Sequence, residues 1–157
     1  MIQLRDITDN DRVEIEHWPS YPADFQDLDY ALREGGWLDE YRERPETWCF
    51  AAEEAGELIG FTILSKTGTD DAEFRIALRP DKTGGGLGTF VTGMTLEAGF
   101  TDIGLARIHL IVRKNNPRAL RVYNGLGFKE TGECVKIING MNVDIIMMDL
   151  HKDSFLI

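Results

Sequence analysis

The chain has 157 residues, of which 43% are apolar and 28% charged, a balance that predicts one compact domain with its own hydrophobic core. Acidic side chains outnumber basic ones by 27 to 17, and the net charge of −10 excludes non-specific binding to nucleic acid, which needs a basic surface. No apolar stretch could span a bilayer, no secretory signal opens the chain, and Cys49 and Cys134 lack metal-binding spacing, so we expect a cytoplasmic protein without a metal or a membrane contact.

The first third of the chain predicts a strand followed by helices. Residues 3–6 have strand character, and Thr8 opens a group of capping residues for a helix that runs to about Trp18. Residues 19–45 show no strand period and are rich in aromatic and acidic side chains. This composition favours one or two short helices and loops.

Six runs with strand composition follow. They are residues 47–53, 58–65, 72–78, 107–112, 128–136 and 141–150. The first two and the last two runs are joined by short turns and therefore predict hairpins. One helix is expected after a glycine-rich turn, and another begins at Pro117 and stops at Gly125 or Gly127. The order predicts a mixed α/β domain with one sheet and helices on its faces.

The glycine-rich turn combines the end of a strand, several glycines and the start of a helix. The first N–H groups of a helix have no partner within it, so they can donate to phosphate oxygens, and glycines let the backbone approach closely. The residues of this predicted anion site are Thr83, Gly84, Gly85, Gly86, Leu87, Gly88 and Thr89. The site is not a P-loop, because no Lys-Ser/Thr pair follows the last glycine, and its glycine spacing differs from the dinucleotide fingerprint. A flexible turn without a ligand is the alternative interpretation.

A second motif comes one helix and one strand later. Its residues are Asn116, Ala119, Tyr123, Gly127 and Phe128, in the pattern Asn-x-x-Ala-x-x-x-Tyr-x-x-x-Gly-Phe. Together with the glycine loop after residues 77–80, this motif resembles the GNAT superfamily of N-acetyltransferases, over roughly residues 73–128. One position departs from the family pattern, because Thr83 stands where the loop usually begins with Arg or Gln.

The resemblance implies a fold and a reaction. The fold is α/β, with a single mixed, mostly antiparallel twisted sheet and helices on both faces, and it makes residues 1–157 a single N-acetyltransferase domain. The reaction is transfer of an acetyl group from acetyl-CoA, the co-substrate, to a primary amine of a small molecule or peptide by direct attack in a ternary complex.

The resemblance also implies roles for named residues. Backbone N–H groups from Thr83 to Gly88 would hold the CoA pyrophosphate. Residues 76–78, including Ala77 and Leu78, would splay from residues 108–112, and their open edge would pair with the pantetheine arm. The N–H group near Leu78 would polarise the thioester carbonyl.

Three residues of the second motif, Asn116, Ala119 and Tyr123, complete the acetyl-CoA site that the resemblance implies. Asn116 would hydrogen-bond the cofactor arm or an ordered water. Tyr123 would protonate the leaving thiolate, since a phenol pKa of about 10 suits a thiol pKa of about 8.5. A packing role for Tyr123 on an amphipathic helix is the alternative.

The base that accepts the amine proton is less well marked. Glu73 resembles the base position of some relatives and is our candidate. Asp71 lies close by, and His109 is a third candidate because imidazole titrates near neutral pH. A water chain that ends at backbone carbonyls would also serve.

The acceptor pocket in this family is built from the regions that correspond to residues 19–45 and 137–142. Their aromatic and acidic side chains suit a cationic amine, such as a polyamine, an aminoglycoside, an amino acid or a peptide N-terminus. Three other functions stay open: a CoA-binding sensory domain without catalysis, a nucleotide-phosphate-binding protein, and acyl transfer to a hydroxyl or with a longer acyl chain. The apolar tail at residues 155–157 is compatible with a homodimer or with a closing contact to the core.

Overall fold

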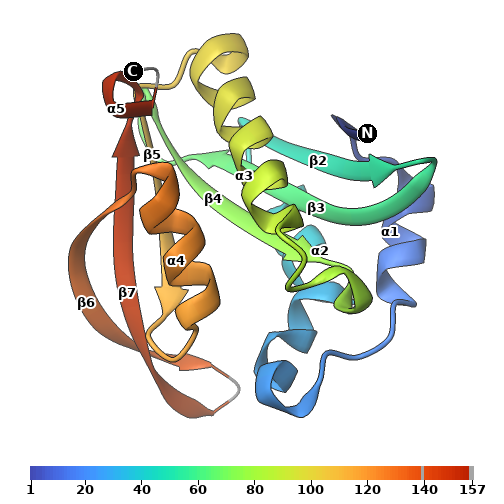
Figure 1. Cartoon of the computed structure of the whole chain (residues 1–157). Coiled ribbons are helices and arrows are strands. Elements are labelled where there is room, and N and C mark those ends of the chain that lie inside the picture. Colours follow the sequence, from blue (N-terminus) through green and yellow to red (C-terminus); the bar gives the residue numbers. More distant parts are fainter. Residues whose placement is uncertain (139, 156–157) are drawn as a thin grey trace.

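The computed structural model describes residues 1–138 and 140–155, apart from the side chains of residues 24–27. One twisted sheet of seven strands, in the order β1-β2-β3-β4-β5-β7-β6, forms the centre of the described structure (Figure 1). The strands are β1 (Ile2–Asp6), β2 (Thr47–Glu54), β3 (Glu57–Lys66), β4 (Asp71–Leu78), β5 (Arg107–Arg113), β6 (Lys129–Ile138) and β7 (Met141–His151).

Strands β4 and β5 are the parallel pair, and the other neighbours in the sheet are antiparallel. The parallel pairing is short and ends where Glu73 lies opposite His109. Beyond that point β4 pairs only with β3 and β5 only with β7, so the two strands diverge. The resemblance implied that residues 76–78 splay from residues 108–112, and this is confirmed, because β4 pairs with β5 only through residues 71–73.

Helical segments account for most of the remaining chain. They are α1 (Asp9–Glu16), the 3-10 helix η1 (Ala23–Leu32), α2 (Trp37–Arg42), the 3-10 turn η2 (Pro80–Lys82), α3 (Leu87–Glu97), the π-helical η3 (Ala98–Ile103), α4 (Pro117–Leu126) and α5 (Lys152–Phe155). Thr8 caps α1 as predicted, in a reciprocal capping box with Asp11. Helix α1 ends at Glu16, before the expected Trp18, and the π-helical continuation of α3 was not predicted.

The helices cover both faces of the sheet (Figure 1), which confirms the predicted fold class. Helices α3 and α4 lie over one core, which includes Phe74, Leu96 and Tyr123. Helix α1, η1 and α2 cover a second core on the opposite face, to which Ala77 contributes. Because side chains alternate along a strand, Glu73 and Arg75 lie on this second face.

Helix α4 stops at Gly127, one of the two glycines predicted to end it, and the φ of +103° there marks the left-handed cap. A short helix, α5, follows β7 and places the ring of Phe155 5.4 Å from that of Phe100, a core contact. The rest of the tail named for a homodimer, Leu156 and Ile157, lies outside the described residues. Within the described chain, none of the helices has the length and apolar character needed to cross a membrane.

Candidate active site

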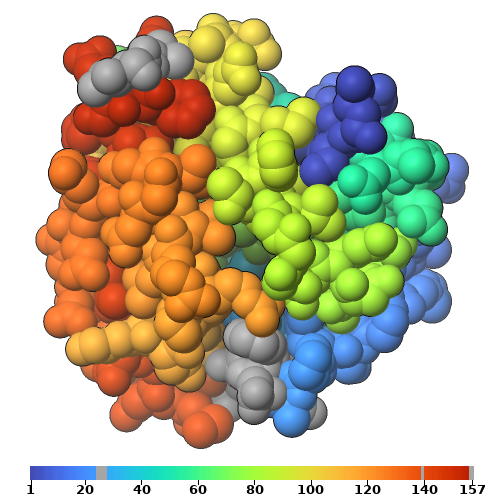
Figure 2. All heavy atoms as spheres, viewed as in Figure 1, coloured from blue at the N-terminus to red at the C-terminus, as the bar shows by residue number. Residues whose placement is uncertain are grey.

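The divergence of β4 and β5 opens a groove with a volume of about 450 Å³. Figure 2 shows this face hollowed between the yellow-green segment that contains the glycine loop and the orange α4. All residues predicted to bind acetyl-CoA line the groove except Gly85 and Leu87. The lining ones are Ala77, Leu78, Thr83, Gly84, Gly86, Gly88, Thr89, Asn116, Ala119 and Tyr123. The structure therefore brings the two sequence motifs together on one cavity.

The glycine loop leaves the start of α3 without a side-chain cap. Gly84 and Gly86 both have φ of +82°, a conformation that other residues rarely adopt, and Gly86 is the N-cap residue. The hydroxyl of Thr83 is used within the turn, because it donates to the carbonyl of Pro80 at 3.1 Å. Leu87 packs its side chain into a small core, so it can offer a ligand only its backbone. The free N–H groups of α3 make this end suitable for phosphate oxygens.

Arg118, in the first turn of α4, adds a positive charge beside the loop. Three atoms of its guanidinium group lie 3.6 Å from the point that a Cβ atom on Gly84 would occupy. Arg118 and Arg121 both line the groove. A cation from α4 thus stands near the loop in which Thr83 replaces the usual Arg or Gln. Sequence reasoning missed Arg118, although it follows Asn116 by two positions at a helix start.

The end of β4 presents an open backbone edge to the groove. The N–H group of Arg79 donates to Ile59 of β3 at 2.8 Å. The N–H and C=O groups of successive residues in a strand point to alternate sides. Those of Leu78 therefore point away from β3, toward the side on which β5 has diverged. There the carbonyl of Leu78 accepts a hydrogen bond from Tyr21 Oη at 2.6 Å. Burial raises the pKa of Tyr21, which keeps the phenol protonated as the donor.

Asn116 and Tyr123 belong to the same helix but have different surroundings. The Oδ1 atom of Asn116 caps α4 by accepting from the N–H group of Ala119 at 3.2 Å, which leaves its amide NH₂ for a ligand. Tyr123 is 8% exposed and packs edge-on against Phe74 and Phe128. Its hydroxyl has no hydrogen bond to any described residue. Burial raises the pKa of Tyr123 to about 12, and the charge of Arg75 acts in the opposite direction.

A second cavity of about 110 Å³ continues the groove to the other side of the diverging strands. Seven residues line both spaces, among them Tyr21, Asn116 and Tyr123. The smaller cavity has aromatic walls that include Tyr30 and Trp37. Among its described lining residues, the charged side chains are those of Arg75 and Arg113.

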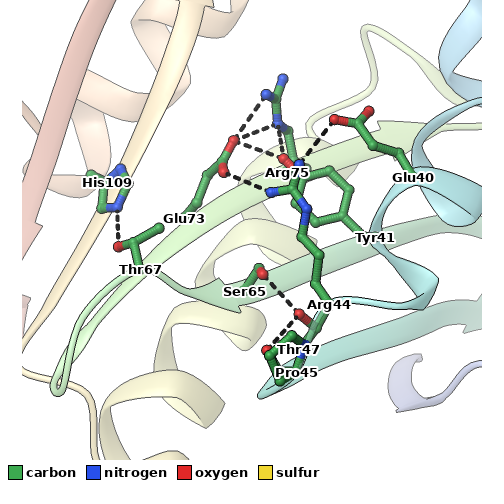
Figure 3. Close-up of polar contacts among 10 residues, drawn as sticks. All are labelled: Glu40, Tyr41, Arg44, Pro45, Thr47, Ser65, Thr67, Glu73, Arg75 and His109. Carbon is green, nitrogen blue, oxygen red and sulfur yellow. Dashed lines mark hydrogen bonds and ion pairs between the residues drawn. The ribbon is translucent and has the colours of Figure 1, made fainter.

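The predicted base, Glu73, lies in a cluster of charged side chains (Figure 3). It is not among the described residues that line the second cavity. Its Oε1 atom accepts hydrogen bonds from Tyr41 Oη at 2.8 Å and from Arg75 Nε at 3.0 Å, and Arg75 Nη2 lies 2.9 Å away. Its Oε2 atom faces Arg44 at 3.9 Å. Arg44 is also paired with Glu40 at 3.2 Å.

The other two candidate bases are also engaged outside the cavities. Asp71 forms an ion pair with Arg107 at 3.3 Å. His109 Nε2 lies 2.8 Å from the hydroxyl of Thr67 (Figure 3), and burial lowers the pKa of this imidazole, with a further contribution from Arg107. Neither residue lines the groove or the smaller cavity in the described structure.

Comparison with known proteins agrees with this arrangement. Residues 10–128 match the profile of the Acetyltransferase (GNAT) family. The chain belongs to the GNAT family. The matched span contains both sequence motifs and most of the groove, so the family assignment rests on the same residues as the site.

Two relatives of this GNAT chain are spermidine N(1)-acetyltransferases. The protein from Escherichia coli K12 is 36% identical over 87 residues, which cover 54% of this chain and 47% of the relative. The protein from Vibrio cholerae is 33% identical over 102 residues, which cover 64% of this chain and 57% of the relative. The match thus spans only about half the length of these curated relatives.

Solved structures of similar proteins extend the likeness to the whole fold. The crystal structure of spermidine N-acetyltransferase from Vibrio cholerae in complex with CoA and spermine has a TM-score of 0.82 and 25% identity, covering 99% of this chain and 98% of that one. A K23–Y30 chimera of spermidine N-acetyltransferase SpeG from Vibrio cholerae and hSSAT has a TM-score of 0.79 and 26% identity, covering 99% of each chain.

Several groove residues of this GNAT chain were not singled out from its sequence. Tyr21 and Arg75 reach the site from segments distant in the chain, and only the fold shows their proximity to Tyr123. Thr92 lines the groove from α3 with a buried hydroxyl that has no hydrogen-bond partner in the described structure. Thr92 carried no sequence signal, because one hydroxyl on a mostly apolar helix is common.

Proposed function

We propose that the protein transfers an acetyl group from acetyl-CoA to a primary amine of a small molecule or peptide, by direct attack in a ternary complex. The observation that carries the proposal is the continuity of two spaces. A large groove beside the glycine loop joins a smaller, aromatic cavity across the gap between β4 and β5, and Tyr123 borders both. A donor and an acceptor can therefore approach each other from opposite sides of the sheet.

The groove residues fit acetyl-CoA. The uncapped N–H groups of α3 and the guanidinium of Arg118 would hold the pyrophosphate. The open edge of β4 would pair with the pantetheine amides, and the N–H group of Leu78 would donate to the thioester carbonyl. The amide NH₂ of Asn116 would bind the pantetheine arm.

Acetyl-CoA supplies an electrophilic carbonyl carbon. The amine nitrogen bonds to that carbon, the carbon–sulfur bond breaks, and the electron pair leaves with sulfur. Tyr123 gives its phenolic proton to the thiolate, and the raised pKa keeps that proton in place at neutral pH. The hydroxyl has no described partner that would compete for this role.

We keep Glu73 as the proposed acceptor for the amine proton, acting through a water. Its Oε1 atom is occupied by Tyr41 and Arg75, but its Oε2 atom has only the distant contact with Arg44. That oxygen is the part of the carboxylate left to accept a proton. Support for this role is chemical, because base catalysis needs a proton acceptor near the amine.

A cationic acceptor is supported by two observations. The net charge of −10 attracts ammonium groups, and the relatives are named for spermidine. The aromatic walls of the smaller cavity suit a protonated amine before it loses its proton.

A homodimer is part of the proposal. Strand β6 is the last strand of the sheet and exposes Val135 and Ile137, next to the exposed Met141 of β7. A second copy that paired along β6 would cover these apolar side chains. Sedimentation analysis tests this point, and a monomer at high concentration would contradict it.

The decisive experiment is calorimetric titration with acetyl-CoA, with ATP and NAD as controls, followed by a thiol-release assay with an amine panel. Saturable binding of acetyl-CoA alone and amine-dependent thiol release are expected. Binding without release for any amine would favour a CoA-binding sensory domain. Release with alcohols in place of amines would favour O-acyl transfer.

A further inference from the structure

Two arginines line the acceptor side of the gap in the described structure. The described residues that line the smaller cavity include two charged ones, Arg75 from β4 and Arg113 from β5. Their side chains stand on the two strands that diverge around the gap, and both are largely buried. Buried guanidinium groups in a ligand cavity are suited to a carboxylate, which accepts two parallel N–H bonds.

Arg75 is held in place with part of its guanidinium group unused. Glu73 Oε1 occupies the edge formed by Nε and Nη2, at 3.0 and 2.9 Å. The Cζ atom lies 5.1 Å from the ring centroid of Trp37, which fixes the guanidinium plane by a cation–π contact. The Nη1 group makes no hydrogen bond or ion pair to a described residue. This free donor belongs to a preorganised side chain, so a ligand can bind it at little entropic cost.

Glu73 offsets part of the charge of Arg75 but leaves its Nη1 donor unoccupied. Arg75 lines the smaller cavity, whereas Glu73 is not among its described lining residues. Arg75 is also close enough to Tyr123 for its charge to lower the pKa of that phenol. A group bound to Arg75 therefore sits near the residue assigned to the leaving thiolate.

We propose that the acceptor carries a carboxylate next to its amine, as a free amino acid does, and that Arg75 binds this carboxylate, with Arg113 on the facing strand. This inference rests on the proposed function, since it names the class of amine that the same site takes. The size of the cavity, about 110 Å³, suits a compact zwitterion, and its aromatic walls suit an apolar side chain. A polyamine has no carboxylate oxygen to accept a hydrogen bond from the Nη1 group of Arg75.

The test compares acceptors that differ only in the carboxylate. Wild-type protein is assayed for thiol release from acetyl-CoA with L-phenylalanine, L-phenylalanine amide and 2-phenylethylamine, with L-leucine and its matching amide and amine, and with spermidine. We expect kcat/KM for an amino acid to exceed that of its amide and its amine at least tenfold. Because the amine of the amide is less basic, a preference for the acid cannot come from a larger neutral fraction of the nucleophile.

A variant ties the preference to the residue. Arg75→Gln should lower kcat/KM for the amino acid at least tenfold more than kcat/KM for 2-phenylethylamine, mainly through KM, and leave the KM for acetyl-CoA within about twofold. Arg107→Gln, which removes an ion-paired arginine on β5 outside the cavity, is the matched control and should change none of these values. If Arg75→Gln does not fold, the wild-type comparison decides by itself.

The outcomes separate this inference from the function beneath it. Turnover of spermidine or of the simple amines, with none or less for the amino acids, overturns the carboxylate proposal and leaves acetyl transfer standing. Equal losses in Arg75→Gln for acceptors with and without the carboxylate also overturn it. Failure to bind acetyl-CoA at all removes the proposed function and this inference together.

Discussion

Arg118 lies beside Gly84, across two motifs that are separated in the sequence: three guanidinium atoms are 3.6 Å from the point that a Cβ atom on Gly84 would occupy. This arrangement brings the start of α4 against the glycine loop, so the charge of one motif supports the backbone of the other. A glycine at this position has φ of +82°, which a side chain would strain. Both residues can therefore be tested as parts of one phosphate site.

The variant Gly84→Ala should weaken the binding of acetyl-CoA several-fold. An alanine in this left-handed conformation costs about 1 kcal/mol, and the loop can relieve that cost by moving away from the geometry that a phosphate needs. Calorimetric titration gives the dissociation constant. Gly93→Ala is the control, because its Cβ atom meets open space within α3, and there alanine should raise the melting temperature without changing affinity. Unchanged affinity in Gly84→Ala would show that the loop does not contact the donor.

Replacing Arg118 by Gln should raise the dissociation constant of acetyl-CoA about tenfold at low salt. Hydrogen bonds to charged groups are worth about 1.5–3 kcal/mol, and salt screens the electrostatic part. The difference from wild type should therefore shrink as ionic strength rises. Arg42→Gln, which breaks an exposed ion pair with Asp9, is the control and should leave affinity unchanged. A salt-independent effect would point to a packing role for Arg118.

The features that sequence reasoning found are those whose function depends on neighbours in the chain. The glycine loop needs a helix directly after it, and Asn116 caps the helix that it begins. Gly127 ends the same helix in a left-handed conformation. Each of these follows from backbone geometry within a few residues, so the pattern alone indicates it.

The features that sequence reasoning missed depend on where distant segments meet. Tyr21 reaches Leu78 across 57 positions in the chain, and nothing local to Tyr21 indicates that bond. In the sequence, Arg75 is one polar residue within a strand. Only the divergence of β4 and β5 in the folded sheet shows that it lines a cavity. Register and divergence are properties of the whole sheet, which one strand cannot reveal.

Replacing Tyr123 by Phe should lower kcat about 100-fold or more, the usual scale of general-acid catalysis, with little change in the KM for acetyl-CoA. The ring contacts with Phe74 and Phe128 remain in this variant, so the fold should persist. The pKa of about 12 means that Tyr123 keeps its proton through neutral pH and loses it only in strong base. Wild-type activity should therefore show no loss from this group below about pH 10. Full activity in the variant would assign Tyr123 to packing alone.

Stability should fall in base because burial makes three phenols, those of Tyr21, Tyr41 and Tyr123, resist ionisation. Tyr41 and Tyr123 have pKa values of about 12 in the folded chain, above the ordinary value of 10.0 in the unfolded one. Their contribution is complete below pH 10 and is lost as the pH rises through 12, since the unfolded chain ionises first. At pH 11 each would contribute about 1.4 kcal/mol less than at pH 9.

Urea unfolding at pH 9 and pH 11 measures this loss. The variant Tyr123→Phe has one such phenol fewer, so its free energy of unfolding should fall by about 1.4 kcal/mol less than that of wild type over the same interval. Equal losses in the two proteins would mean that Tyr123 ionises as easily in the folded chain as in the unfolded one.

The variant Glu73→Gln distinguishes two roles for Glu73, as the base that accepts the amine proton and as the residue that orients Arg75. As a base, Glu73 would contribute about 100-fold to kcat/KM for every acceptor, with or without a carboxylate. As a support, it would act through Arg75, to which it is bonded at 2.9 Å, and the loss would fall on KM for carboxylate-bearing acceptors alone. We expect the first pattern, because Oε2 is left to accept a proton. Asp71→Asn, on the same strand and paired with Arg107, is the control and should retain wild-type kcat/KM with every acceptor. A loss confined to amino acids would transfer the base role to water and leave Glu73 as the residue that orients Arg75.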